Sequence, residues 1–176
     1  MRIRMATSRD RDEIRDVHRS AFRENEHELV SRLAVDLLAQ ETAPRVISLV
    51  AECDGIIVGH VAFSPVTIDS DKDFRGYILA PLGVRPAYQG RRVGSQLVDA
   101  GMQQLSQSGI DILFVYGDPA YYGRFGFRAE PAGQFKPPYE LQYPSGWQAL
   151  ALGESPVVNL PANLACVASL CDAALW

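Results

Sequence analysis

The stretch LAPLGVRPAYQGRRVGS, residues 79–95, decides the fold of this 176-residue chain. Its first half is apolar and belongs to a strand predicted over Tyr77–Val84. A turn that contains Gly90 follows, and apolar residues then recur at helical spacing from about Arg91 to Ser106. The stretch therefore predicts a strand that leads through a glycine turn into a helix.

This predicted turn has the properties of a phosphate site. The first turn of a helix leaves several backbone N–H groups without partners and carries a partial positive charge. Backbone amides in such a turn can hold a pyrophosphate. Gly90 and Gly94 let the backbone approach closely, and Arg91 and Arg92 add positive charge. A glycine turn alone is a common pattern, so it indicates a phosphate site only together with a second motif.

The chain on either side of this stretch alternates strands and helices. Other strands are predicted over residues 1–5, 47–53, 56–68, 110–116 and 147–152, with one more beginning at Phe127. Other helices are predicted over residues 8–22, over the stretch holding Leu29 to Leu37, and over Leu160–Leu175. Residues 128–146 are expected to form a long ordered loop, and Asp54-Gly55 suits a two-residue hairpin turn.

This order of elements predicts an α/β fold, an α+β mixed sheet with helices on both faces. The length suits one domain over residues 1–176, with a core at about 2–152 and a C-terminal extension at 153–176.

The second motif is DPAYYGRFGF, residues 118–127. Asp118 and Pro119 make a good helix start, an acidic cap with proline at the first helical position. Gly126 keeps this helix short. Tyr122 lies at its end.

Together the two motifs resemble the GNAT superfamily of N-acetyltransferases, over roughly residues 2 to 130. Gln89 and Gly94 match the first and last positions of its acetyl-CoA signature, Gln/Arg-x-x-Gly-x-Gly/Ala. Arg92 replaces the first glycine, and its side chain would either clamp the phosphates or crowd them. The DPAYYGRFGF run is similar to a subgroup of mostly uncharacterised members.

The resemblance implies a mostly antiparallel sheet of the GNAT fold and transfer of an acetyl group from acetyl-CoA to an amine, without a metal. It implies that Tyr122 is the general acid. The backbone of Leu82–Val84 would bind the pantetheine arm and orient the thioester. The turn and first helical residues would hold the pyrophosphate, which makes the expected cofactor-binding residues Leu82, Gly83, Val84, Gln89, Gly90, Arg91, Arg92, Val93, Gly94 and Ser95.

The general base has no single candidate in the sequence. Conceivable residues are Glu26, Glu28, Glu52, His60 and Asp118. Glu28 is the choice made here because it begins the second helix, which borders the acceptor site in the family, although a water chain to solvent is an alternative. The aromatic loop with Phe135 to Tyr143 would either close the acceptor pocket or cover a sheet edge.

Composition excludes several classes of function. The net charge of −4 argues against general nucleic-acid binding. No apolar stretch is long enough to span a membrane, the N-terminus lacks a secretory signal, and a cytoplasmic protein is expected. Cys53, Cys166 and Cys171 form no metal-ligand pattern. The expected partner is a small-molecule or peptide amine, and the expected state is a monomer or homodimer. Rival functions are an acyl-CoA sensor without turnover and an unrelated nucleotide-phosphate protein.

Overall fold

The computed structural model describes residues 1–154 and 161–176. Its strands belong to a mixed, mostly antiparallel sheet in the order β1-β2-β3-β4-β5-β7, with β8 paired to β3 and to β6. The chain divides into two compact units, residues 1–63 with 80–101 and residues 64–79 with 102–176. Strands β3 (Ile56–Ile68) and β4 (Gly76–Val84) and helix α3 (Val93–Gln107) each contribute to both units.

The first unit contains β1 (Arg2–Met5), α1 (Arg11–Ala21), α2 (His27–Ala39) and β2 (Ile47–Cys53). It also contains the first half of β3, the last residues of β4 and the start of α3. Strand β2 pairs antiparallel with β1 and with β3. Asp54 and Gly55 both have positive φ in the turn between β2 and β3, which confirms the predicted hairpin.

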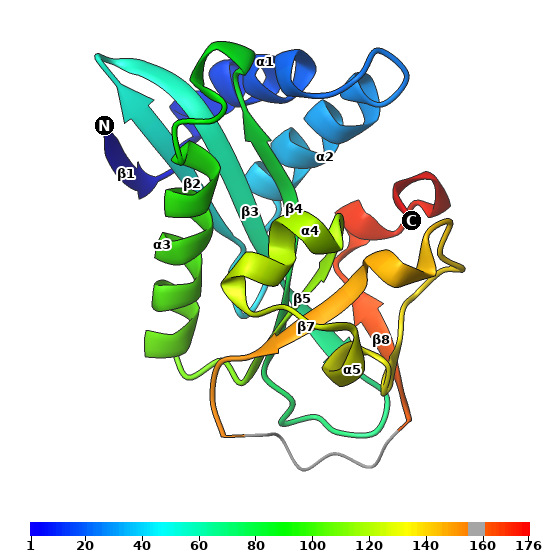
Figure 1. Ribbon diagram of the computed structural model, residues 1–176. Helices are drawn as coiled ribbons and strands as arrows, with labels where there is room; N and C mark the ends of the chain where they lie inside the picture. Colours follow the sequence, from blue (N-terminus) through cyan, green and yellow to red (C-terminus); the bar gives the residue numbers. More distant parts are fainter. Residues whose placement is uncertain (155–160) are drawn as a thin grey trace. The chain divides into compact units, whose positions relative to one another are not determined.

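Helices cover both faces of the sheet within this unit. Helices α1 and α2 pack side by side (Figure 1), and Ile14, Val17 and Ala34 form a buried cluster with Val50 and Ile57 of the sheet. On the opposite face, a Cβ added at Gly59 would lie 3.0 Å from both Leu97 and Val93 of α3. The helical spacing of apolar residues therefore predicted the buried faces correctly.

The second unit is built on β5 (Ile112–Tyr116), which pairs parallel with the start of β4 and antiparallel with β7 (Trp147–Ala151). It also holds α4 (Pro119–Tyr122), α5 (Ala129–Ala132), β6 (Phe135–Lys136) and β8 (Ala162–Cys166). Its core contains a stack of Phe114 on Trp147, with ring centroids 5.3 Å apart. The Trp147 indole N–H donates to the backbone oxygens of Ala132 and Phe135, at 3.1 and 3.0 Å.

Three predictions in the second unit were wrong. No strand begins at Phe127, because Arg128 makes only an isolated bridge to Ala149 before α5 begins. The expected loop at 128–146 contains α5, β6 and a 3-10 turn at Pro144–Gly146. The expected terminal helix over Leu160–Leu175 begins at a residue outside the described ones, and its described part contains β8 and two short 3-10 turns.

The reason for the last error is visible in the burial of β8. Ala162 and Leu164 are buried and alternate with exposed neighbours, which is the period of a strand. Leu164 to Cys166 pairs with Ile68 to Val66 at the end of β3. A partner strand far away in the sequence therefore decided the conformation of an apolar segment whose local pattern was ambiguous.

Candidate active site

The turn before α3 is fixed by hydrogen bonds to the two strands that precede it. The Arg85 amide donates to the Val58 oxygen at 2.9 Å, and its guanidinium Nε donates to the Ile57 oxygen at 2.8 Å. The side-chain amide of Gln89 donates to the Val84 oxygen at 2.9 Å. Gln89 therefore holds the turn back against the end of β4.

Two residues of this turn lie in the left-handed region, Gly90 with φ +72° and Arg92 with φ +63°. Glycine adopts this region without steric cost, whereas other L-residues adopt it at a cost of about 1–2 kcal/mol. Arg92 occupies the position where the signature has its first glycine. The chain keeps the backbone conformation of a glycine there although the residue is an arginine.

The first turn of α3 fits an anion. The Gln96 amide bonds to the Arg92 oxygen at 3.0 Å, so the amides of Val93, Gly94 and Ser95 precede the regular helical bonds. The first turn of the helix contains no acidic residue. Residues 89–92 are exposed, and the Arg91 guanidinium lies 5.5 Å from the centroid of the Tyr88 ring. The predicted pyrophosphate residues thus combine the amides of a helix start with exposed residues on its N-terminal side, Arg91 and Arg92 among them.

The end of β4 packs directly under a histidine. Gly83 is buried, and a Cβ added there would lie 2.7 Å from Nδ1 of His18 and 2.9 Å from its Cε1. Leu82 and Val84 are half-buried on either side. Only glycine at position 83 therefore allows the His18 ring of α1 to lie against this strand.

In the second unit, Tyr122 lies at the end of α4. Asp118 caps this helix, because its Oδ1 accepts from the Ala120 amide at 2.9 Å, as the motif predicted. The Tyr122 ring lies against the backbone of Gly117, where an added Cβ would be 2.5 Å from Cε2. Burial, and to a lesser extent Tyr121, raises the pKa of Tyr122 well above its ordinary value. The phenol is therefore protonated at every physiological pH.

A cavity of about 330 Å³ lies beside Tyr122 at the carboxyl end of β5. Gly117 contributes both to this cavity and to the seat of the Tyr122 ring. Tyr143 lines the cavity, and its amide donates to the Tyr116 hydroxyl at 2.8 Å. The other lining residues are Tyr116, Asp118, Pro119, Ser145 and Gly146. Phe135 belongs to the same aromatic loop as Tyr143, but its side chain is buried against Phe114.

Three of the four carboxylates considered as general bases, Glu28, Glu52 and Asp118, are engaged in other contacts. Glu28, on the first turn of α2, forms an ion pair with Arg19 of α1, and its side chain is 64% exposed. Glu52 pairs with Arg4 at 2.8 Å, and Glu26 lies at the N-cap of α2. Asp118 caps α4.

His60 is fully buried, and both of its ring nitrogens have partners. Nδ1 lies 2.8 Å from Nε2 of His18, and Nε2 lies 2.8 Å from Oγ of Ser48. Sequence reasoning considered His60 but did not find His18 or Ser48. The three residues come from β3, α1 and β2, and no spacing along the chain joins them.

The described residues contain no group of three or more His, Cys, Asp or Glu side chains arranged to hold a metal ion. Within the same part of the chain, every helix is too short or too polar to cross a membrane.

Comparison with known proteins adds independent findings. Residues 2–129 match the family model described as an acetyltransferase (GNAT) domain. The uncharacterised N-acetyltransferase YjhQ of Escherichia coli K12 is 34% identical over 163 residues, which cover 89% of this chain and 87% of YjhQ.

Two solved structures are similar along most of the chain. The GNAT family N-acetyltransferase YhbS of Escherichia coli, solved in complex with CoA, has a TM-score of 0.75 and 30% identity, and the match covers 86% of this chain and 81% of YhbS. A GNAT family acetyltransferase of Brucella melitensis, solved with acetyl-CoA, has a TM-score of 0.65 and 33% identity, covering 90% and 93% of the two chains.

Proposed function

Because this chain belongs to the GNAT family of acetyltransferases, we propose that it transfers an acetyl group from acetyl-CoA to a primary amine by direct attack in a ternary complex. The observation that carries the proposal is the turn before α3. It offers three helical amides, a glycine in the left-handed region and two exposed arginines to a pyrophosphate. The relatives solved with CoA and acetyl-CoA support this donor.

In this proposal the backbone at the end of β4 orients the thioester, and the residues of the turn hold the pyrophosphate. Binding by backbone fixes the position of the donor without requiring particular side chains at 82–84. The backbone amides at the end of β4 can also stabilise the oxyanion that forms when the amine attacks the carbonyl carbon.

Tyr122 is proposed as the general acid. When the bond between the carbonyl carbon and sulfur breaks, the phenol gives its proton to the departing thiolate, and the phenolate regains a proton from the attacking nitrogen as it becomes an amide. A raised pKa keeps the phenol protonated before that step, but it also makes the phenol a weaker acid. The proton therefore moves only as the carbon–sulfur bond breaks and negative charge develops on sulfur.

The cavity beside Tyr122 is proposed to receive part of the acceptor. The cavity is lined almost wholly by apolar surface, and Tyr116 and Tyr143 contribute to it. This lining suits an apolar part of the acceptor next to its amine.

The experiment is release of free CoA thiol from acetyl-CoA with and without a panel of small amines, amino acids and peptides with a free N-terminus. We expect release that depends on the amine, and a fall in kcat of about 100-fold in Tyr122→Phe with an unchanged Kd for acetyl-CoA. Tyr121→Phe, at the neighbouring ring, is the matched control and should retain kcat.

Acetyl-CoA binding without release by any amine would favour an acyl-CoA sensor instead. Stronger thermal stabilisation by ATP than by CoA would contradict the proposed donor.

A further inference from the structure

Three buried side chains of the first unit form a chain of hydrogen bonds behind the end of β4. His18 and His60 are each 0% exposed and Ser48 is 5% exposed. Both links of the chain, from His18 Nε2 to His60 Nδ1 and from His60 Nε2 to Ser48 Oγ, measure 2.8 Å. Buried polar groups of this kind are nearly always fully bonded.

The His18 end of this hydrogen-bonded chain is an exception to that rule. Nδ1 of His18 is buried and has no hydrogen-bond partner among the described residues. It lies against Gly83, within 2.7 Å of the position that a Cβ would occupy. A buried ring nitrogen without a partner is costly, and this one faces the segment of β4 that we propose holds the thioester.

The other end of the chain reaches a second cavity. Ser48 lines an open cavity of about 490 Å³ together with Met5, Ala6 and residues from the end of α2 and from the segment between α2 and β2. The hydrogen-bonded chain therefore runs from the donor strand, between α1 and the sheet, to a residue that lines a cavity large enough for several water molecules.

With both rings neutral, the two hydrogen bonds allow only two arrangements of the protons, which we call the two orders. In the first, His18 Nε2–H donates to His60, His60 Nε2–H donates to Ser48, and Nδ1 of His18 has a free lone pair. In the second, Ser48 donates to His60, His60 Nδ1–H donates to His18, and Nδ1 of His18 carries a proton. The chain can therefore change from one order to the other when one proton enters at His18 and one leaves at Ser48.

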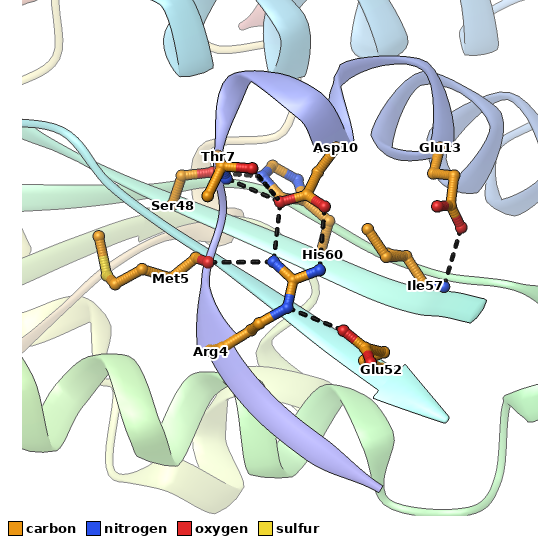
Figure 2. A network of polar contacts seen from close by, with 9 residues as sticks. All are labelled: Arg4, Met5, Thr7, Asp10, Glu13, Ser48, Glu52, Ile57 and His60. Carbon is orange, nitrogen blue, oxygen red and sulfur yellow. Dashed lines mark hydrogen bonds and ion pairs between the residues drawn. The ribbon is translucent and has the colours of Figure 1, made fainter. Parts of the chain in front are cut away.

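The surroundings keep the chain neutral before the reaction. Burial lowers the pKa of His18 to about 3. Burial, and next the neighbouring His18, lowers the pKa of His60 well below its ordinary value, while Asp10 acts in the opposite direction. Figure 2 shows Asp10 near His60, where its carboxylate accepts from Arg4 and from Thr7.

The titratable groups that act on His18 and His60 are therefore the two imidazole rings themselves and the Asp10 carboxylate. Asp10 forms an ion pair with Arg4. Strand β2 contributes the Ser48 hydroxyl, and β4 contributes the backbone of Gly83.

We propose that His18 is the general base of the reaction and that His60 and Ser48 relay its proton to the cavity. This inference rests on the proposed function. His18 is the catalytic residue because its Nδ1 takes the proton directly, whereas His60 and Ser48 are positioning residues that act through it.

The N–H bond of the bound ammonium breaks as the proton bonds to Nδ1 of His18, which leaves a neutral amine to attack the thioester. The Nε2 proton of His18 passes to His60, the Nε2 proton of His60 passes to Ser48, and the Ser48 hydroxyl proton passes to water in the cavity. After product release, His18 returns its proton to solvent and Ser48 regains one from the cavity water.

Access to His18 depends on Phe22. The His18 ring stacks on Phe22, with ring centroids 5.9 Å apart, and Phe22 at the end of α1 is only partly buried. The proposal therefore includes a movement of Phe22 that admits the acceptor to the imidazole.

The first test compares His18→Gln with wild type. The glutamine amide can reproduce the Nε2 bond to His60 but offers nothing at the Nδ1 position, so the fold is retained and the base is lost. With the amine from the panel that gives the fastest thiol release, kcat should fall about 100-fold while the Kd for acetyl-CoA is unchanged.

The pH dependence separates a base from a structural residue. Wild-type kcat/KM for the amine should be nearly constant between pH 6 and 9, because His18 is already neutral. In His18→Gln, kcat/KM for the amine should rise about tenfold per pH unit, because only amine deprotonated in solution can react. Ser48→Ala should lower kcat by removing the exit of the relay, and Ser48→Thr should restore it.

A flat pH profile and near-normal kcat in His18→Gln would overturn the inference. A second measurement decides independently of any acceptor, through the ¹⁵N resonances of labelled histidine in the wild-type protein. A bare Nδ1 on His18 at pH 7 supports the inference, and a protonated Nδ1 overturns it. Absence of amine-dependent release in wild type would instead contradict the proposed function.

Discussion

The turn at residues 89–95 and the His18–His60–Ser48 chain belong to the same compact unit, yet they are built in opposite ways. The turn uses the backbone of consecutive residues, and its side chains are mostly exposed. The histidine chain uses side chains from α1, β2 and β3, and all three are buried. Binding of a charged donor can be encoded within a few residues, whereas a buried proton path requires the complete fold.

The two regions also tolerate substitution differently. In the turn, a side chain is acceptable wherever it points to solvent, as Arg92 shows at a position with positive φ. In the buried chain, His60 is fixed by a bond on either side, His18 by its bond to His60 and its contact with Gly83, and Ser48 by its bond to His60.

Gly94→Glu should have the largest effect, because it places a carboxylate at the buried first turn of α3 where the phosphates are proposed to bind. Steric conflict and charge repulsion should weaken acetyl-CoA binding by about 100-fold, equivalent to about 2.7 kcal/mol. Calorimetric titration measures this change. Gln103→Glu adds the same charge at an exposed position further along α3 and should leave the Kd unchanged. Equal affinity of the two variants would place the phosphate site elsewhere.

These two regions also show which features of the site can be predicted from the sequence and which cannot. The turn, the short helix α4 with its Asp118 cap and the hairpin at Asp54-Gly55 were predicted because neighbouring residues determine them. His18 was missed, because in the sequence it is one of several polar residues on an amphipathic helix. Its role depends on Gly83 and His60, which lie 65 and 42 residues further along the chain.

Gly83→Ala should destabilise the first unit. The added methyl group would lie 2.7 Å from His18 Nδ1, so the buried ring must move. Overpacking of this kind costs about 1–3 kcal/mol, measured as a lower urea midpoint at unchanged slope. Gly133→Ala is the control, because a Cβ there meets its nearest atom at 3.5 Å and the backbone is helical. A loss of stability no larger than in this control would show that His18 does not pack on Gly83.

Asp10→Asn should cost on the order of 2 kcal/mol at pH 7, because the contacts of Asp10 lower its pKa from 3.8 to about 2. Arg4 is the largest cause of the shift. A lowered folded-state pKa contributes stability above pH 3.8 that is lost as the pH falls toward 2. The difference between wild type and variant should therefore shrink over that window in acid unfolding. Asp12→Asn, on an exposed side chain, should change nothing measurable. A pH-independent difference would exclude ionised Asp10 as the cause.

Arg92→Gly should have the smallest effect on stability and a modest effect on binding. Relief of the positive φ is partly cancelled by the entropy of glycine, so a gain of about 0.5 kcal/mol or less is expected. Loss of the exposed guanidinium should weaken acetyl-CoA binding a few-fold at low salt, with a smaller difference at high salt. Tighter binding by the glycine variant would show that Arg92 crowds the phosphates.

Transfer of radiolabelled acetyl groups in a single turnover tests the account most directly. Excess enzyme is mixed with labelled acetyl-CoA and the best amine of the panel, quenched in acid at short times, and separated into protein, amine and CoA fractions. Direct transfer in a ternary complex predicts that label leaves acetyl-CoA and enters the amine at the same rate, with none bound to protein. Label that accumulates on the protein first, or remains on acetyl-CoA at all times, would contradict it.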